Sequence, residues 1–338
     1  MFFSIIIPAF NAEKTIEYAL SSVQKQSFTD FEVIIIDDGS TDNTQKICVK
    51  FSNYDSRFKY YRQTNKGASA SRNRGLLEAK GTFITFIDAD DLIPMHYLSE
   101  FFSLASNNID CDNYWCGINY CSVANNIQLN TLNFPKLDCL FDSKKNILSL
   151  QQYAPYNAMC NKIFKRDILI KNQIFMPEDL SLGEDLIFNL RYLDCTNGKI
   201  AINPSPLYVY CTNNENSLDR KFRSDLLEIY NRIDSELLDY LVKWNVDSSQ
   251  MEIYHNSVLF HKIKVLYNTY RSECPLSRIE KLRYNSKLIR SNEFKKALEN
   301  STASFHPLYR IAYKIGSWQM IRFLDYLVKI KKRFKGSD

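Results

Sequence analysis

Two acidic clusters early in the chain have the residue types of a site that binds a cation or a polar ligand. The first, Asp88-Ala89-Asp90-Asp91, directly follows the apolar run 82–87. Carboxylates at positions i and i+2 can hold one hard cation such as Mg²⁺ or Mn²⁺, while water and phosphate oxygens complete its shell. The alternative is a local turn in which Asp91 caps a following helix. We favour the cation site because the cluster follows a buried strand and lies one strand away from a second acidic cluster.

The second cluster, residues 37–42, begins with the adjacent carboxylates Asp37 and Asp38. Adjacent carboxylates repel each other unless something binds them, and one of them could accept hydrogen bonds from a base N–H or a ribose hydroxyl. A local turn is again the alternative, because Asp, Gly and Ser form turns without any ligand. Lys66, Arg72 and Arg74 would add donors and positive charge, although a solvated helix face would also explain the two arginines.

The surrounding pattern predicts how these clusters are positioned. Apolar runs at 3–7, 33–36, 58–62 and 82–87 predict four strands, and helical patterns lie between them. The first helix is expected from a cap at Asn11 through residue 26, and Gly81 is expected to stop the third. This alternation predicts βαβ units and a mostly parallel sheet, whose ligands bind beyond the carboxyl ends of the strands. Both acidic clusters follow such ends.

The rest of the chain is less regular. From 109 to about 152 the pattern weakens, with a strand-like run at 114–123, and after about 218 the spacing is helical throughout. A length of 338 residues predicts one large domain plus an appendage.

Composition excludes several classes of protein. Of the net charge of +5, an excess of seven lies between residues 310 and 335, so a nucleic-acid-coating protein is disfavoured. The nine cysteines are scattered and are expected to be free and buried. With no run of 18 apolar residues and no basic region before the first apolar run, we expect a cytoplasmic protein. The fingerprints of dinucleotide folds, P-loops, serine hydrolases and zincins are missing from the sequence.

Five segments in order along the chain resemble those of one known family. They read SIIIPAFN at 4–11, IDDGSTD at 36–42, NKGASASRN at 65–73, FIDADD at 86–91 and GED at 183–185. Over roughly residues 1–215 the chain resembles the family 2 inverting glycosyltransferases of GT-A fold that build bacterial capsule, exopolysaccharide or cell-wall glycans. The resemblance implies an α/β fold with a mixed, mostly parallel sheet flanked by helices. It implies a catalytic domain at 1–218, with a nucleotide-sugar half at about 1–108 and an acceptor half at about 109–218, before a helical region at 219–338.

The resemblance also implies roles for individual residues. Asp38 or Asp37 would read the base, and Arg72 would lie near the diphosphate. Asp88 with Asp90 would bind the ribose and Mn²⁺ or Mg²⁺. Asp185 would be the catalytic base, and Glu184 would hold the acceptor or order its loop. The whole nucleotide-sugar site would consist of Pro8, Phe10, Asn11, Asp37, Asp38, Lys66, Arg72, Asp88 and Ala89.

The chemistry that follows is a single displacement. A carboxylate within reach of the acceptor hydroxyl takes its proton, and inversion turns an α-linked donor, expected to be a UDP-sugar, into a β-linked product. The helix dipole at the start of the helix after Gly183 is expected to keep Asp185 ionised. The Gln-x-x-Arg-Trp motif of processive relatives is missing, so we expect single-sugar transfer. The alternatives are a non-catalytic nucleotide-sugar- or partner-binding protein, and a nucleotidyltransferase, which would need a Gly-rich basic loop where residues 8–11 stand.

The C-terminal residues predict peripheral membrane contact through 310–335, at the inner face of the cell membrane. Basic amphipathic helices lie on anionic lipid surfaces, which would suit an acceptor carried on a lipid diphosphate. The alternative is a helix that packs on the catalytic domain with a solvated basic tip. One apolar stripe is expected from Ile311, Ile315, Trp318, Ile321, Leu324 and Val328, and a basic end from Lys329, Lys331, Lys332, Arg333 and Lys335.

Overall fold

The computed structural model describes residues 1–122, 127–132, 141–150, 157–212 and 221–335. The chain divides into two compact units, which are taken one at a time below. Unit 1 comprises Met1–Glu215 and Asp239–Val246, and unit 2 comprises Asn216–Leu238 and Asp247–Asp338.

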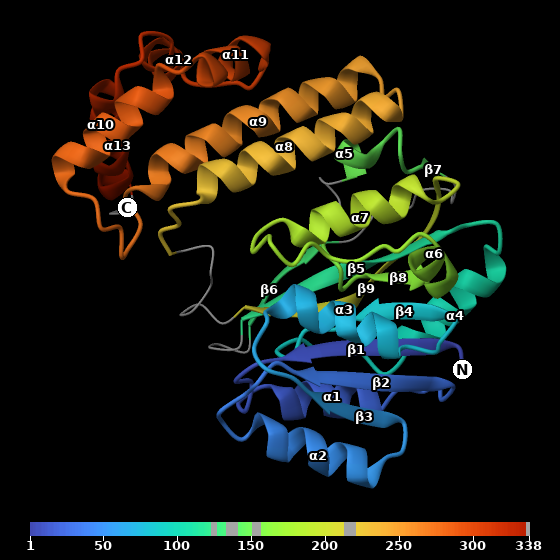
Figure 1. The fold of residues 1–338 in the computed structure, drawn as a ribbon. Helices are drawn as coiled ribbons and strands as arrows, with labels where there is room; N and C mark the ends of the chain where they lie inside the picture. Colours follow the sequence, from blue (N-terminus) through green and yellow to red (C-terminus); the bar gives the residue numbers. More distant parts are fainter. Residues whose placement is uncertain (123–126, 133–140, 151–156, 213–220, 336–338) are drawn as a thin grey trace. The chain divides into compact units, whose positions relative to one another are not determined.

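Unit 1 is built on one mixed sheet (Figure 1). Its order is β3-β2-β1-β4-β8-β5-β9-β7, with β6 paired to β5. The first four strands are mutually parallel, β8 is antiparallel to both of its neighbours, and β5 and β9 are parallel. The strands are β1 (Phe3–Ala9), β2 (Phe31–Asp37), β3 (Phe58–Arg62), β4 (Phe83–Phe86), β5 (Asn113–Ser122), β6 (Ile127–Leu132), β7 (Phe141–Asp142), β8 (Lys162–Lys165) and β9 (Lys199–Thr212).

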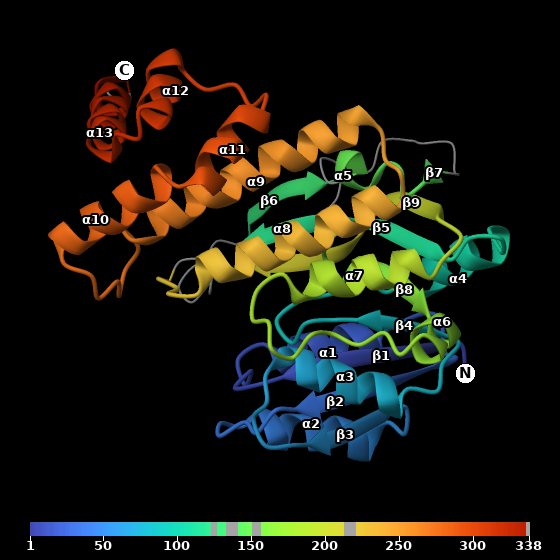
Figure 2. The same ribbon diagram turned by 45° about the horizontal axis from the view of Figure 1, so that its top comes forward.

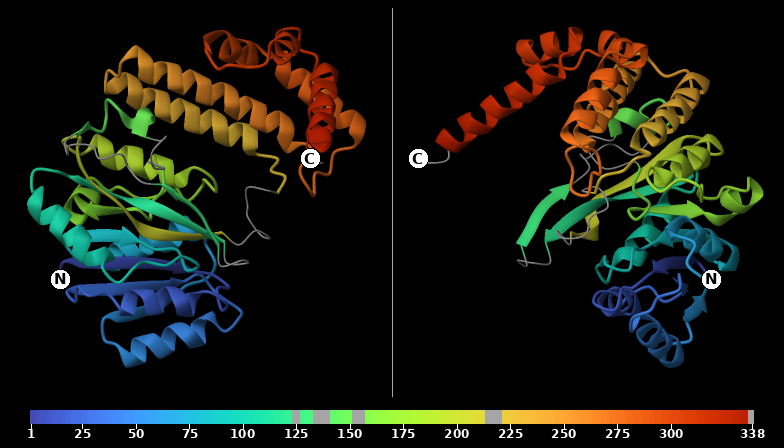
Figure 3. Two further views of the ribbon diagram at one scale, coloured as in Figure 1. Left: turned by 180° about the vertical axis from the view of Figure 1, so that it is seen from behind. Right: turned by 60° about the vertical axis from the view of Figure 1, so that its left-hand side comes forward.

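Helices cover both faces of this sheet, as the near-continuous apolar strands require. Alternate residues of a strand point to opposite faces, so Ile5 and Ile7 pack with α1, α2 and α4, whereas Ile6 packs with α3, α6 and α7 (Figures 1 and 3). The helices are α1 (Ile16–Gln24), α2 (Thr44–Tyr54), α3 (Ala68–Glu78), α4 (Tyr97–Asn107), α5 (Ile147–Leu150), α6 (Arg166–Lys171) and α7 (Glu184–Asp194). The predicted α/β class with a mixed sheet flanked by helices is confirmed.

Two local predictions about helix ends were wrong. Helix α1 begins after Thr15, and Asn11 instead adopts a left-handed backbone (φ 48°) and accepts a hydrogen bond from the Thr41 N–H at 2.9 Å. Asn tolerates this conformation, so it joins the turns after β1 and β2 rather than capping a helix. Helix α3 already ends at Glu78, and Gly81 is required by a close approach, because a Cβ there would lie 2.5 Å from the Ser4 nitrogen.

In the part of unit 2 that the structure describes, the regular elements are all helices, joined by loops with one isolated β-bridge between Lys221 and Ser272 (Figure 2). Asp247, Ser277 and Ser291 cap α9, α10 and α11 through their side chains. The helices are α8 (Leu226–Lys243), whose last residues count with unit 1, α9 (Ser248–Asn268), α10 (Arg278–Ile289), α11 (Asn292–Asn300), α12 (Pro307–Lys314) and α13 (Trp318–Lys335). No helix among the described residues is both long and apolar enough to cross a membrane.

The predicted C-terminal stripe is divided between two helices. Gly316, with φ 64°, separates α12 from α13, so one continuous helical face does not form. Trp318, Ile321 and Leu324 are buried within unit 2, whereas the other three members of the stripe are exposed. The side chains of the basic residues from 329 onward lie outside the described set.

Candidate active site

The parallel strands β1 to β4 bring four chain segments to one edge of the sheet. Residues 10–11 follow β1, Asp38 follows β2, residues 63–67 follow β3 and Asp88 lies just beyond β4. These are the carboxyl ends of neighbouring parallel strands, where open α/β sheets bind their ligands. The sequence-predicted donor-site residues therefore share one edge.

The two adjacent carboxylates of the second cluster have different surroundings. Asp37 is completely buried, and its oxygens accept hydrogen bonds from the Ser40 N–H at 2.8 Å and the Tyr60 hydroxyl at 2.6 Å. In the structure Asp37 thus holds the turn after β2 to strand β3.

Asp38 instead organises the loop that follows β3. One oxygen accepts hydrogen bonds from the Gln63 side chain (2.8 Å) and the Lys66 N–H (2.9 Å), and the other accepts one from the Gly67 N–H (2.7 Å). Gly67 has φ 92°, which a residue with a side chain rarely adopts, so this approach depends on glycine. The loop leaves the Lys66 side chain exposed at the same edge.

The segment after β1 presents an aromatic ring. Phe10 is 49% exposed, Pro8 is half-buried, and Asn11 is exposed but tied to residues 40–41. An exposed ring fixed at a strand end can stack on a planar ligand such as a base.

A charged cluster joins this edge to helix α7. Arg72, on α3, is nearly buried and donates a hydrogen bond from Nη2 to Asp88 Oδ1 at 2.7 Å. Its Nη1 lies 3.7 Å from Asp185 Oδ1. Arg72 therefore connects the predicted cation ligand Asp88 with the predicted base Asp185, residues that are far apart in the sequence.

The predicted base, Asp185, has a partly desolvated and charged environment. It lies in the first turn of α7 after Gly183, which is left-handed (φ 81°). Its Oδ1 is buried without a hydrogen-bond partner, and so is Arg72 Nε. Burial raises the pKa of Asp185 to about 7, against the opposing charge of Arg72. Desolvation thus acts against the ionisation of this carboxyl that the helix dipole is expected to favour.

Glu184 precedes Asp185 and acts on it through its negative charge. Its side chain is partly exposed, and its negative charge adds to the rise of the Asp185 pKa.

Sequence reasoning missed one residue of this cluster, Lys162 on β8. It is almost completely buried, donates a hydrogen bond from Nζ to Asn161 Oδ1 at 2.7 Å, and lies 4.4 Å from the centroid of the Trp115 ring. Burial lowers its pKa to about 7, and its charge acts on Asp185. The available signal was weak, because Lys162 is the first residue of the short strand β8, which also ends in a lysine, Lys165.

The residues after β4 divide into structural and open positions. Asp91 is buried and accepts hydrogen bonds from the Tyr208 hydroxyl (2.6 Å) and the Cys211 N–H (2.8 Å), both on β9. It does not cap α4, which begins at Tyr97 after His96. Ala89 is half-buried, and Asp90 is exposed. The protein around Asp90 and the nearby charge of Asp88 raise the Asp90 pKa.

Among the described residues, no three His, Cys, Asp or Glu side chains converge on a self-contained metal site. Asp88 and Asp90 nevertheless fit a shared cation, because the charge of Asp88 acts on Asp90 and Arg72 binds only one oxygen of Asp88. Two carboxylates match a cation such as Mg²⁺, which takes its remaining ligands from phosphate and water.

Comparison with known proteins places this geometry in a family. The sequence pattern of "Glycosyl transferase family 2" matches residues 4–172, half of the chain. The poly(ribitol-phosphate) beta-N-acetylglucosaminyltransferase TarS of Staphylococcus aureus is 31% identical over 221 residues, 64% of this chain and 36% of that protein. A Campylobacter jejuni GalNAc(5)-diNAcBac-PP-undecaprenol beta-1,3-glucosyltransferase is 40% identical over 90 residues, 26% of this chain and 29% of that protein. The matches thus span about a third of each relative.

Solved structures agree on the fold. The crystal structure of S. aureus TarS 1-349 in complex with UDP-GlcNAc superposes with a TM-score of 0.70 and 20% identity, covering 98% of this chain and 92% of that one. The sheet edge, the Arg72 cluster and the matched sequence pattern therefore agree: the chain belongs to glycosyltransferase family 2 and has the GT-A fold.

Proposed function

We propose that this chain transfers one sugar, a hexose or N-acetylhexosamine, from a UDP-sugar to a glycan or lipid-diphosphate-linked acceptor in the synthesis of a bacterial surface polysaccharide, with inversion to a β-linkage. One observation carries the proposal. Arg72 touches both Asp88, at the edge where a diphosphate and its cation would lie, and Asp185, whose buried oxygen has no partner. The proposed catalytic base, Asp185, and the carboxylate proposed to lie near the leaving diphosphate, Asp88, thus interact with the same Arg72 guanidinium.

The donor site is proposed at the carboxyl edge of β1 to β4. The Phe10 ring and the loop held by Asp38 would bind the nucleoside, with Asp37 behind them holding the turn. Asn11 and Pro8 would border it, and Lys66 and Ala89 would complete it. The relative solved with UDP-GlcNAc shares this fold, which supports a uridine nucleotide.

The proposed mechanism is one in-line displacement. Asp185 accepts the proton of the acceptor hydroxyl as that oxygen attacks the anomeric carbon, which requires the ionised carboxylate. The positive charge of Arg72 offsets the negative charge that develops on the leaving diphosphate. A Mn²⁺ or Mg²⁺ ion held by Asp88 and Asp90 would supply further charge neutralisation at the same oxygens. Glu184 would hold the acceptor or order its loop.

The acceptor proposal draws on the relatives and on α13. The two relatives named above act on a poly(ribitol-phosphate) and on an undecaprenyl-diphosphate-linked glycan. On α13, Phe323, Tyr326 and Leu327 are exposed on one side, and the sequence that follows is basic. We propose that residues 310–335 contact the inner face of the cell membrane, where a lipid-linked acceptor would be presented.

The test is donor turnover by the full chain. Hydrolysis of UDP-GlcNAc, UDP-Glc and UDP-Gal is measured with and without Mn²⁺, and transfer is then measured to undecaprenyl-diphosphate-linked sugars. We expect one donor to be consumed and Asp185→Asn to lose that activity while Asp167→Asn, an exposed acid in the first turn of α6, keeps it. Donor binding without any turnover would favour the non-catalytic alternative. Conversion of the UDP-sugar with added pyrophosphate into UTP and a sugar 1-phosphate would favour the nucleotidyltransferase.

A further inference from the structure

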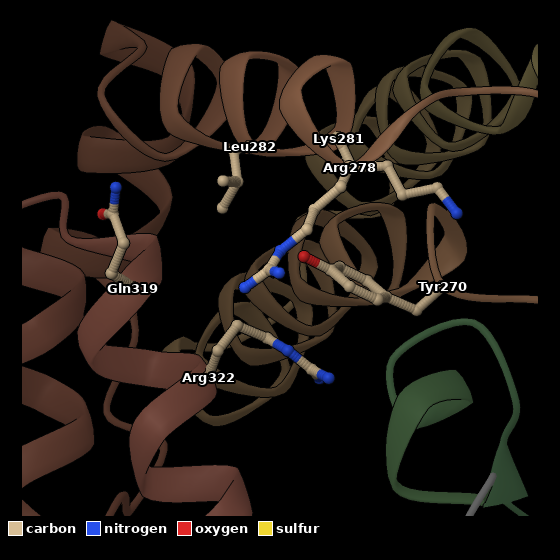
Figure 4. Close-up of a pocket in the computed structure, with 6 residues that line it drawn as sticks. All are labelled: Tyr270, Arg278, Lys281, Leu282, Gln319 and Arg322. Atoms are coloured by element: carbon tan, nitrogen blue, oxygen red, sulfur yellow. The ribbon is translucent and has the colours of Figure 1, made fainter.

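Unit 2 contains a cavity that the transfer reaction does not use. Its volume is about 490 Å³, within the range of ~300–1,000 Å³ typical of small-ligand sites. It lies where the end of α9 meets α10 and α13, and Figure 4 shows the side chains that surround it. They are Tyr270, Arg278, Lys281, Leu282, Gln319 and Arg322.

The lining has an excess of positive charge. Arg322 forms an ion pair with Asp325 at 3.2 Å, but within the described residues Arg278 and Lys281 have no ion-pair partner. Asp325 also accepts hydrogen bonds from the Tyr267 and Tyr309 hydroxyls, each at 2.9 Å. Its carboxylate is therefore shared among Arg322 and these two hydroxyls. Two cations at this cavity, Arg278 and Lys281, are therefore not offset by an ion pair with any described carboxylate, and an anion bound there would be attracted to both.

An aromatic group holds the cations in place. The Arg322 guanidinium lies 4.2 Å from the centroid of the Tyr270 ring, and Lys281 Nζ lies 5.8 Å from it. The Tyr270 hydroxyl accepts a hydrogen bond from Nε1 of the buried Trp318 at 3.0 Å. A tyrosine fixed in this way orders the donors before any ligand arrives, and pre-ordering lowers the entropic cost of binding.

The donors are side chains rather than a helix end. Arg278 and Lys281 are three residues apart on α10, as Gln319 and Arg322 are on α13, so each pair shares one helix face. The Ser277–Glu280 capping box already satisfies the start of α10. A hydrogen bond from Arg290 Nε to the Gly316 carbonyl (3.2 Å) links the end of α10 to the turn before α13.

We propose that this cavity binds the phosphate group of a phosphate ester. Guanidinium groups donate paired hydrogen bonds that match phosphate oxygens, and two of them with an ammonium group favour a phosphate over a carboxylate. The volume leaves room for the organic substituent, against which Leu282 offers an apolar side. The phosphate can belong to a soluble or polymeric ester or to a lipid headgroup. This binding goes beyond the transfer reaction and does not depend on it.

The experiment measures binding of inorganic phosphate and of glycerophosphoglycerol to the full chain by calorimetry. We expect the double variant Arg278→Gln/Lys281→Gln to weaken both at least ~10-fold, since hydrogen bonds to charged groups are strong. Arg283→Gln, an exposed arginine of α10 outside the cavity, is the matched control and should bind as the native chain does. Both altered side chains are at least partly exposed, so the variants should fold.

A vesicle arm distinguishes the sources of the phosphate. If the double variant loses binding to phosphatidylglycerol vesicles, the ester is a headgroup. If it keeps vesicle binding but binds the soluble esters more weakly, the ester belongs to a soluble or polymeric molecule. Equal phosphate affinity in the native chain and the double variant, or no measurable binding, overturns the proposal. So does loss of binding in Arg72→Gln alone, which would place the phosphate at the donor site. UDP-sugar hydrolysis by the double variant, expected to be unchanged, tests the proposed function separately.

Discussion

The reactivity of Asp185 depends on a balance between desolvation and charge. Burial of Oδ1 disfavours the carboxylate, whereas Arg72 and Lys162 favour it, and the outcome is a pKa of about 7. A base with a pKa near the working pH combines a useful ionised fraction with a strong affinity for the proton. Arg72 adds a second function, because the same guanidinium bonds Asp88. A change at any of these side chains therefore alters the others.

The first prediction concerns pH. The kcat/KM for donor turnover should rise about tenfold per pH unit below about pH 7 and level off above it, because only ionised Asp185 accepts a proton. Asp185→Asn should lower the rate at least ~100-fold and abolish this dependence, while UDP binding persists. A pH–rate profile of both proteins checks this. Near-normal turnover of Asp185→Asn, or greater damage from Glu184→Gln, would show that the base is misassigned.

The same pKa predicts a change in stability. A carboxyl whose pKa is raised by folding contributes its stability at low pH and loses it as pH rises through the folded-state pKa. Asparagine mimics the protonated form, so the melting temperature of Asp185→Asn relative to the native chain should increase between pH 5 and pH 8. Thermal melts at several pH values measure this difference. A difference that does not change with pH would contradict the raised pKa.

A further prediction concerns the dependence of donor turnover on a divalent cation and is tested at Asp90. Asp90→Ala should remove Mn²⁺-dependent donor turnover without loss of fold, because this side chain is exposed and forms no ion pair with any described residue. Asp110→Ala, at an exposed position after α4, is the control. Donor hydrolysis with Mn²⁺ and with excess EDTA provides the measurement. Full activity in EDTA, or an unaffected Asp90→Ala enzyme, would contradict the metal assignment.

At the scale of elements, strand β9 fixes the loop that carries Asp88 and Asp90. Asp91 receives two hydrogen bonds from β9, and the Asp88 N–H donates to the Tyr208 hydroxyl at 3.3 Å. The strand belongs to the proposed acceptor half of unit 1, yet it positions the carboxylates proposed for the donor side. The two halves of the unit are thus joined at the site itself.

This arrangement predicts the effect of Tyr208→Phe. Loss of the hydroxyl removes a hydrogen bond to a buried carboxyl, so the free energy of unfolding should fall by about 1–3 kcal/mol and donor turnover should fall with it. Tyr54→Phe, at a position 85% exposed, should change neither. Denaturant unfolding and donor hydrolysis test the pair. Unchanged stability in Tyr208→Phe would show that this hydrogen bond from β9 does not stabilise the loop after β4.

At the scale of the whole molecule, the helical unit offers two features that could bind a partner. The cavity between α10 and α13 is cationic, and farther along α13 Phe323, Tyr326 and Leu327 are exposed before the basic end of the sequence. Deletion of residues 310–338 would also remove the buried Trp318 and Ile321 and damage the unit. Substitutions on the exposed side are therefore the cleaner way to examine membrane contact.

The corresponding prediction is that the full chain floats with phosphatidylglycerol vesicles at low salt. Binding should weaken as salt rises, because each basic residue near an anionic surface contributes about 1 kcal/mol. Phe323→Ser/Leu327→Ser should reduce flotation, whereas Leu77→Ser, an exposed apolar residue of unit 1, should not. Flotation that is insensitive to salt and to these substitutions would contradict the proposed contact.

Much of the fold and part of the site could be read from the sequence. Strand direction follows from βαβ alternation, so the residues after 3–7, 33–36 and 82–87 had to share one edge, and this placed Asp38 and Asp88 together. Residue type alone did not determine what these side chains do in the turns after the strands. Asn11 and Asp91 are of types that commonly cap helices, but each accepts a hydrogen bond from a segment distant in the sequence instead.

Only the tertiary structure decided the electrostatics of the site. The contact of Arg72 with Asp185, the burial of Lys162 and the different surroundings of Asp37 and Asp38 all arise where strands and helices distant in the sequence pack together. The sequence by itself determined which ionisable groups exist and at which edge most of them gather. Their pKa values depend on how much water every neighbouring element excludes, and that quantity exists only once the chain has folded.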